Sequence, residues 1–242
     1  MKILCVSDQV DPFIYTQSIK SQFGDVGAVL CAGDLPMSYI DFIVSTLNKP
    51  TFFIFGNHNL KEYKYYRSDI RRNPMELASS ALIEAQHAHG ATYAGFKCIR
   101  DGTILVRDPV TKKDRPLLIA GIDGSIDYNH GLCQFTESQM NFRLAKMAPS
   151  LIYNKLKYGT YLDIFLTHAS PRHIHDKEDP CHKGFECFNK FLKKYEPTFM
   201  VHGHIHLYDM NEERVGVYGK TTVVNAYSHH VIEIPSPEDE EA

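Results

Sequence analysis

The chain has 242 residues, of which 43% are hydrophobic and 23% charged, a composition typical of a folded globular protein. Its formal net charge of −3 excludes a strong overall attraction to nucleic acid or to an anionic membrane. No apolar run approaches the ~18 residues of a membrane span, and the run 1–6 is too short for a signal peptide. The six cysteines show no CxxC spacing, so we expect a reduced, cytoplasmic protein.

The predicted elements alternate along the chain. Short apolar runs, each followed or closed by Gly, Asp, Asn or His, predict buried strands at Ile3–Ser7, Ala28–Ala32, Thr51–Phe55, Leu117–Gly121, Asp163–Thr167, Thr198–His202 and Thr221–Asn225. A final run, His230–Ile234, alternates more clearly and predicts one more strand. Helical spacing predicts helices at Pro36–Asn48, Thr136–Tyr158 and Gly184–Tyr195, and Thr136 with Gln139 forms a capping-box pattern. The stretch Tyr93–Arg107 is predicted to be a hairpin that turns at Asp101-Gly102.

This alternation predicts an α/β fold with a mixed sheet, or two sheets, between helical layers. No linker or internal repeat interrupts the chain, so residues 1–234 are expected to form a single domain. Residues 235–242, of sequence PSPEDEEA, are expected to form a solvated acidic tail.

Polar residues with ligand chemistry come directly after five of the predicted strands. They are Asp8, Gly33-Asp34, Gly56-Asn57-His58, His168 and Gly203-His204-Ile205-His206. Ligands of open α/β sheets gather beyond the carboxyl ends of the strands, so these side chains should meet at one edge. Carboxylate, amide and imidazole groups suit Mn, Fe, Zn or a similar divalent ion. A single Asp or His after a strand is weak evidence, but five in succession predict a metal centre.

In this order the residues resemble the calcineurin-like metallophosphoesterase superfamily, whose pattern is DxH, GD, GNH, a later His and GHxH. The resemblance implies a sandwich of two mixed β-sheets flanked by helices, with a site for two divalent metal ions. It implies that Asp34 bridges the ions and takes part in catalysis, and that His58 is the catalytic imidazole. The remaining ligands that it implies are Asn57, His168 and His204 for one ion, and Asp8 and His206 for the other.

Two cations about 3.5–4 Å apart can hold a hydroxide between them and neutralise the oxygens of a phosphate. A bound metal makes hydroxide available near neutral pH, and His58 could protonate the leaving oxygen as a general acid. The sequence therefore predicts metal-dependent hydrolysis of a phosphodiester or phosphomonoester, with a small phosphorylated molecule as substrate.

The first motif departs from the family pattern, because Asp8-Gln9-Val10 replaces DxH and a valine cannot bind a metal. The second ion then keeps Asp8, Asp34 and His206, and we expect it to be bound more weakly. Water or Asp11 could take the place of the missing imidazole. A non-catalytic scaffold that binds a protein partner, or a nuclease, would explain the same motifs in other ways.

Several segments around the motifs could contact a substrate. Arg172 and His182 lie in a long irregular stretch after His168 and are the predicted phosphate contacts. The Gly-rich segment 121–129 is expected to be a loop at the same edge. Basic and tyrosine residues between positions 61 and 72 form either a cationic, base-stacking lip or, more simply, a solvated helix face.

Overall fold

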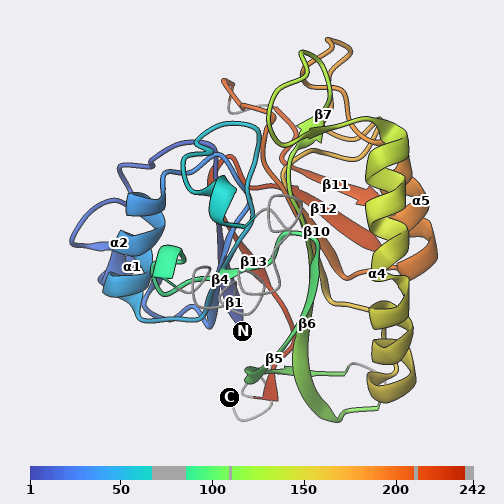
Figure 1. Cartoon of the computed structure of the whole chain (residues 1–242). Helices are drawn as coiled ribbons and strands as arrows, with labels where there is room; N and C mark the ends of the chain where they lie inside the picture. Colours follow the sequence, from blue (N-terminus) through green and yellow to red (C-terminus); the bar gives the residue numbers. More distant parts are fainter. Residues whose placement is uncertain (67–85, 109–110, 210–211, 238–242) are drawn as a thin grey trace.

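The computed structural model describes residues 1–66, 86–108, 111–209 and 212–237, and two mixed β-sheets form its centre (Figure 1). The first sheet contains, in spatial order, β13 (Ser228–Glu233), β1 (Lys2–Ser7), β2 (Ala28–Cys31), β3 (Thr51–Phe53) and β4 (Thr92–Tyr93). The second contains β11 (Val215–Tyr218), β12 (Thr221–Asn225), β10 (Phe199–His202), β9 (Ile164–Thr167), β6 (Asp114–Ile122) and β5 (Lys97–Arg107). A small third sheet pairs β7 (Ser125–Ile126) with β8 (Gln134–Phe135).

Helices cover the outer faces of both large sheets. In Figure 1, α1 (Ile19–Phe23) and α2 (Met37–Leu47) lie beside the first sheet, while α4 (Glu137–Tyr158) and α5 (Glu186–Tyr195) lie beside the second. A short 3-10 helix, Tyr63–Tyr65, follows β3. The predicted capping box is confirmed, since the Thr136 hydroxyl accepts a hydrogen bond from the Gln139 backbone N–H and the Gln139 side chain accepts one from the Thr136 backbone N–H.

The core has two layers because successive strand residues point to opposite faces. Along β1, Ile3 and Cys5 belong to the cluster between the sheets, whereas Leu4 and Val6 belong to the cluster under the helices. The second sheet contributes Leu166 and Val201 to the cluster between the sheets. The predicted sandwich of two mixed β-sheets flanked by helices is therefore confirmed.

Parallel pairing places the ends of the motif-bearing strands at one edge of each sheet. β1, β2 and β3 pair in parallel in the first sheet, and β6, β9, β10 and β12 do so in the second. The carboxyl ends lie toward the upper side of Figure 1, where β6 leads into β7. Each sheet thus presents the loops that follow its parallel strands to the same region.

The predicted hairpin over Tyr93–Arg107 is wrong. Residues Lys97–Arg107 form one long strand, β5, which pairs antiparallel with β6 and changes register between Asp101 and Leu105. The Asp101 carboxylate accepts a hydrogen bond from the Thr103 backbone, so Asp101-Gly102 makes a bulge in an edge strand instead of a turn.

The termini meet at the amino end of β1. The Met1 ammonium donates to the Ile234 carbonyl at 2.9 Å and to the Ser236 hydroxyl at 3.3 Å, and Ser236 is buried. Within the expected tail, Pro235 is exposed and Ser236 is buried, and 238–242 lie outside the described residues. None of the six cysteines, all of them described, forms a disulfide. Among the described helices, none has both the length and the apolarity needed to cross a membrane.

Candidate metal centre

The two large sheets each supply three of the predicted metal ligands. Asp8, Asp34 and Asn57 follow β1, β2 and β3, while His168, His204 and His206 follow β9 and β10. The loops are joined directly, since the His204 backbone N–H donates to both oxygens of Asp8 at 3.0 Å. A backbone N–H after β10 thus binds the side chain of Asp8 after β1, which links the loops of the two sheets.

Unusual backbone conformations direct these side chains inward. Asp8, Asp34 and His204 have φ values of 69°, 57° and 67°, in the left-handed region that side chains rarely adopt. Such residues cost of order 1–3 kcal/mol each and persist where the surroundings over-determine them. At Gly56 an added Cβ would lie 2.1 Å from Asp34 Oδ1, so glycine is required for the close approach of this loop.

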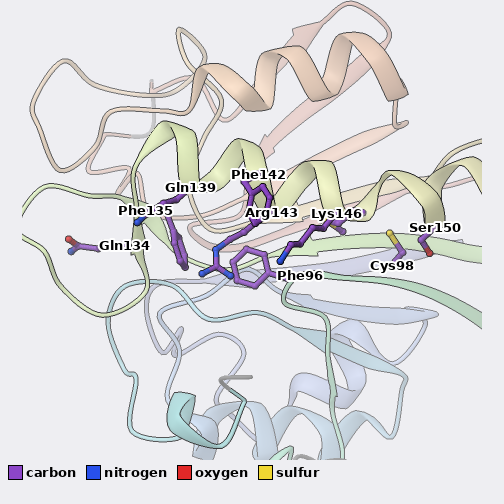
Figure 2. Close-up of a pocket in the computed structure, with 10 residues that line it drawn as sticks. Phe96, Cys98, Gln134, Phe135, Gln139, Phe142, Arg143, Lys146 and Ser150 are labelled. Atoms are coloured by element: carbon purple, nitrogen blue, oxygen red, sulfur yellow. The ribbon is translucent and has the colours of Figure 1, made fainter. Parts of the chain in front are cut away.

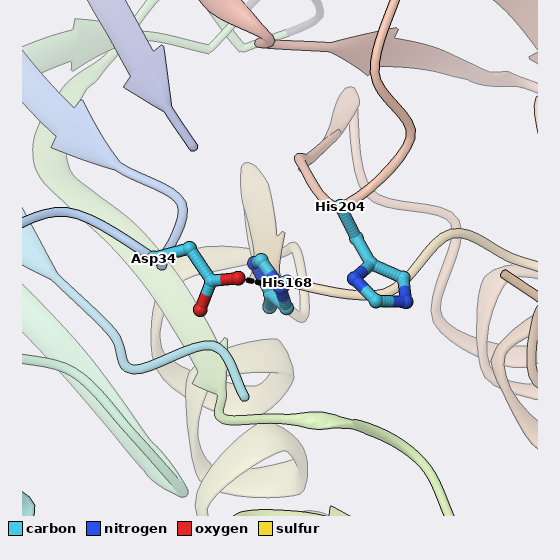
Figure 3. A group of neighbouring side chains, drawn as sticks. All are labelled: Asp34, His168 and His204. Atoms are coloured by element: carbon cyan, nitrogen blue, oxygen red, sulfur yellow. Dashed lines mark ion pairs between the residues drawn. The ribbon is translucent and has the colours of Figure 1, made fainter. Parts of the chain in front are cut away.

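Asp34, His168 and His204 lie around a common point (Figure 3). Each offers an atom within 4.8 Å of the others, and the Asp34 Oδ2–His168 Nε2 distance is 3.3 Å. Asn57 Oδ1 lies 3.1 Å from the same nitrogen. We call these four residues, Asp34, Asn57, His168 and His204, the buried half of the centre, because each is at most 8% exposed.

Hydrogen bonds to carbonyl groups fix which nitrogen of each buried imidazole is free. His168 Nδ1 lies 2.8 Å from the Ala32 carbonyl, and His204 Nε2 lies 2.6 Å from the Cys181 carbonyl. A carbonyl can only accept, so these nitrogens carry the protons in the neutral rings. His168 Nε2 and His204 Nδ1 are then left with lone pairs, the arrangement in which histidine binds a metal.

The other two residues of the buried half are oriented in the same way. Asn57 Nδ2 donates to the Tyr128 hydroxyl at 3.2 Å, which turns its oxygen toward His168. Asp34 Oδ1 accepts from the His58 backbone N–H at 2.7 Å.

Asp34 and His204 are already in the forms that bind a metal. Burial alone would raise the pKa of Asp34, but His168 and the His58 N–H outweigh it and lower that pKa to about 2. Burial, together with the nearby His168, lowers the pKa of His204 to about 4. An ionised carboxylate and a neutral imidazole are the forms that bind a cation. Burial alone would lower the pKa of His168, but Asp34 outweighs it and raises that pKa to about 9, so this ring must lose a proton when an ion binds.

Asp8 and His206 form what we call the open half, in which the Asp8 side chain is only 1% exposed but His206 is held less firmly. His206 Nε2 is 3.7 Å from Asp8 Oδ1, and its side chain is 42% exposed. Val10 is 41% exposed and offers no donor atom. The carboxylate of Asp11 accepts hydrogen bonds from Ser228, from His229 and from the Phe13 backbone, so it is engaged with β13.

The model of the family described as calcineurin-like phosphoesterase matches residues 1–208, most of the chain. The chain belongs to this family. No curated protein matches it. The family points to metal-dependent hydrolysis of phosphate esters at two divalent ions. The oriented oxygen and nitrogen atoms of the buried half fit such an ion.

Solved structures share the fold at low sequence identity. TT1561 of Thermus thermophilus aligns with a TM-score of 0.59 and 15% identity, covering 94% of this chain and 89% of that one. A second crystal structure aligns at a TM-score of 0.61 and 12% identity, covering 96% and 94%. GAP50, described as the anchor in the inner membrane complex of Plasmodium, aligns at 0.51 and 11%, covering 93% and 70%. At these identities the likeness shows the fold alone.

The predicted catalytic imidazole lies beside the buried half. His58 directly follows Asn57, and its side chain is exposed while its backbone bonds Asp34. The segment 121–129 lies at the same edge, as predicted, because its Tyr128 reaches Asn57. Tyr128 itself was missed, since one tyrosine in a Gly-rich loop carries no sequence signal.

A buried carboxylate supports the GNH loop from below. Asp123 Oδ1 accepts from the Phe55 backbone N–H at 2.9 Å, and Oδ2 accepts from the Tyr93 hydroxyl. Asp123 is fully buried, and burial raises its pKa to about 7 against the lowering effect of Tyr93 and Phe55. This role was missed at the level of sequence, because Asp123 follows a strand without a recognised motif.

The two predicted substrate contacts are both paired with acidic side chains. Arg172 bonds Asp176 at 2.5 Å and Glu178 at 2.8 Å. His182 Nδ1 bonds Asp179 at 2.8 Å, and its ring centre lies 5.3 Å from that of His204. His182 therefore lies next to the centre, while Arg172 would have to exchange a partner to meet a phosphate.

Two of the three tyrosines after the GNH motif are not available for stacking on a substrate, and the third, Tyr65, is half-buried and stacks on His87. Tyr63 and Tyr66 are buried and pack against Phe55 and Tyr93. The basic residues at positions 67, 71 and 72 lie outside the described residues. A separate cavity of about 630 Å³ lies along α4, where Arg143 packs over the rings of Phe96 and Phe135 (Figure 2). None of the candidate metal ligands lines it.

Proposed function

We propose that this chain hydrolyses a phosphate ester at two divalent cations that are bound with unequal strength. The ligands proposed are Asp34, Asn57, His168 and His204 for the stronger ion, and Asp8, Asp34 and His206 for the weaker one. The observation that carries the proposal is the buried half, where side chains from two sheets converge and each has a hydrogen-bond partner that orients it.

Bound cations would supply positive charge for the phosphate oxygens and lower the pKa of water. Asp34 would be shared between the two ions. His58, exposed beside the buried half and without a ligand role, would give a proton to the leaving oxygen. The reaction assigns no step to Arg172 or His182, whose contact with substrate stays a prediction.

A singly charged ester is the proposed substrate class, either a phosphodiester or a similar monoanion. A monoester dianion gains most from two fully bound cations, whereas the open half has three protein ligands and an exposed histidine. Turnover of bis-p-nitrophenyl phosphate should therefore exceed that of p-nitrophenyl phosphate when manganese is added. A clear preference for the monoester would overturn this part of the proposal.

The activity itself is tested by replacing His58. His58→Ala should lower the rate on the preferred ester by about 10²–10⁴-fold, the usual range for a general acid, while metal content stays the same. His89→Ala is the matched control, because His89 is exposed outside the centre and pairs with Asp41. A His58→Ala enzyme as active as the wild type would show that the assignment is wrong.

The same assays distinguish two alternative functions, a non-catalytic scaffold and a nuclease. A non-catalytic scaffold would bind manganese at the buried half but hydrolyse none of the substrates. GAP50 shares the fold and is described as an anchor, but its likeness carries no residue-level argument. A nuclease would cleave single-stranded DNA faster than the small esters. Manganese as the physiological metal and a cytoplasmic location stay predictions.

A further inference from the structure

A second group of potential metal ligands lies in the loop between β9 and α5. Asp179, Cys181 and His182 each offer one ligand atom, and these atoms lie within 4.8 Å of one another. Cys181 Sγ is 2.8 Å from Asp179 Oδ1 and 3.5 Å from His182 Nδ1. His182 Nδ1 is 2.8 Å from the same carboxylate oxygen. Three donor types thus converge from a single turn.

The turn is ordered by its own backbone and by its neighbours. The His182 N–H donates to the Asp179 carbonyl at 3.3 Å, and the Lys177 N–H donates to the His182 carbonyl at 3.1 Å. Asp176 bonds Arg172 and the Gly184 backbone, which ties both ends of the loop together. The loop therefore holds the three side chains close together before any metal ion binds.

The spacing of sulfur and nitrogen suits a tetrahedral ion. With zinc–sulfur and zinc–nitrogen bonds of about 2.3 and 2.0 Å, the two atoms would be about 3.5 Å apart, as they are between Cys181 and His182. The contacts of Asp179 with Cys181 and His182 are hydrogen bonds and would lengthen by about 0.5–0.7 Å. On binding, the thiol proton would leave to solvent, and the imidazole proton would move from Nδ1 to Nε2.

The cluster is open to solvent and adjoins the main centre. The side chains of His182 and Asp179 are 33% and 42% exposed, so an ion can reach them. The Cys181 carbonyl accepts the hydrogen bond that orients His204. An ion held by the Cys181 side chain would therefore fix the backbone group that positions a ligand of the buried half.

We propose that Asp179, Cys181 and His182 bind a thiophilic divalent cation of the zinc class, separate from the two cations of the phosphoesterase centre. A thiolate selects softer ions, whereas the main centre offers only oxygen and nitrogen ligands. The proposal does not rest on the hydrolytic activity, because a binding measurement tests it directly.

Cobalt(II) titration of the full chain distinguishes this site from the main centre. A thiolate bound to cobalt gives a charge-transfer absorption band, which oxygen and nitrogen ligands do not give. We expect the band in the wild type, its displacement by zinc, and its loss in Cys181→Ser. Cys98→Ser is the matched control and should keep the band, since Cys98 is half-buried in β5 and the remaining four cysteines are buried.

Further variants separate the ligands and the two centres. Asp179→Asn and His182→Gln should each lower the cobalt affinity, measured from the charge-transfer band, by about tenfold or more. Loss of a residue that only hydrogen-bonds a ligand already lowers metal affinity by about 10–100-fold. His168→Ala should keep the band. Absence of the band in the wild type, or its persistence in Cys181→Ser, would overturn the proposal. Its loss in His168→Ala would show that the thiolate serves the main centre instead of a separate site.

Discussion

The buried half and the open half of the metal centre contain similar ligand types but differ in how those ligands are held. In the buried half, each imidazole nitrogen that faces away from the centre has a carbonyl partner within 2.8 Å. In the open half, the His206 ring is exposed, and its Nδ1 lies 3.1 Å from the hydroxyl of Tyr208, which is exposed as well. The motif GHxH does not distinguish His204 from His206, whereas in the structure the two imidazoles differ in burial and in their hydrogen-bond partners.

From this difference we infer that the strength with which a ligand binds its ion depends on the groups behind it. A side chain that is already fixed loses little conformational freedom when an ion binds, whereas an exposed one must be ordered at a cost of up to about 2 kcal/mol. In addition, Val10 supplies no ligand atom for the metal where the family pattern has an imidazole. The account therefore predicts a strong and a weak metal site within one centre.

The largest effect should come from removing a buried ligand. We expect His168→Ala to weaken the tighter metal site by more than about a thousandfold, since loss of an orienting partner alone costs 10–100-fold. His206→Ala is the matched change in the open half and should weaken only the second site. Metal titration of both variants checks this prediction. Equal losses of metal affinity in the two variants would show that the two halves do not differ as proposed.

Asp123, which supports the GNH loop, should make stability depend on pH. Its pKa in the folded protein is about 7, above the ordinary value of 3.8, so the folded state holds a proton that the unfolded state releases. This stabilisation is fully present at low pH and is lost as the pH rises toward the folded-state pKa of about 7.

The matching variant, Asp123→Asn, cannot ionise. Relative to the wild type, its free energy of unfolding without metal should rise by up to about 4 kcal/mol from about pH 4 to about pH 8. Urea unfolding of both proteins across this range measures the difference. A constant difference would mean that Asp123 is not perturbed in the folded protein.

A smaller effect is expected from the partner of Asn57. Tyr128→Phe removes the hydroxyl to which the Asn57 amide donates and should weaken the tighter site by about 10–100-fold. Tyr227→Phe is the control in the open half, where the hydroxyl bonds Gln9. If both variants bind manganese like the wild type, hydrogen bonding behind the ligands does not set the affinity.

The smallest change concerns the weaker site. Val10→His restores the imidazole of the family pattern and should raise second-site affinity by about tenfold, in line with one added interaction of about 1.4 kcal/mol. Asp11→Asn should leave that affinity unchanged, because the Asp11 carboxylate is engaged by Ser228 and His229. A loss of second-site binding in Asp11→Asn would show that Asp11 fills the gap.

The sequence predicted the strands and the strand-end residues well because both depend on local pattern. Apolar runs such as Ala28–Ala32 identify buried strands, and the glycine before Asn57 marks a turn that leaves no room for a side chain. The β5 strand was mispredicted as a hairpin because Asp101-Gly102 is a turn signal that also suits a bulge. Only the pairing with β6 distinguishes the two.

The groups behind the ligands could not be predicted, because they come from loops far away in the sequence. The Cys181 carbonyl and the Tyr128 hydroxyl have no side-chain motif that marks them as partners of His204 and Asn57. The burial of Asp123 likewise depends on how the two sheets pack. Sequence thus predicted the candidate ligands but not the surroundings that hold them differently.

The most direct test is a manganese titration of the metal-free chain by calorimetry. The account predicts two binding events per chain, of which the second is weaker than the first by at least about tenfold, or 1.4 kcal/mol. Two ions bound with equal affinity would contradict it, because the buried and open halves would then hold their ligands equally well.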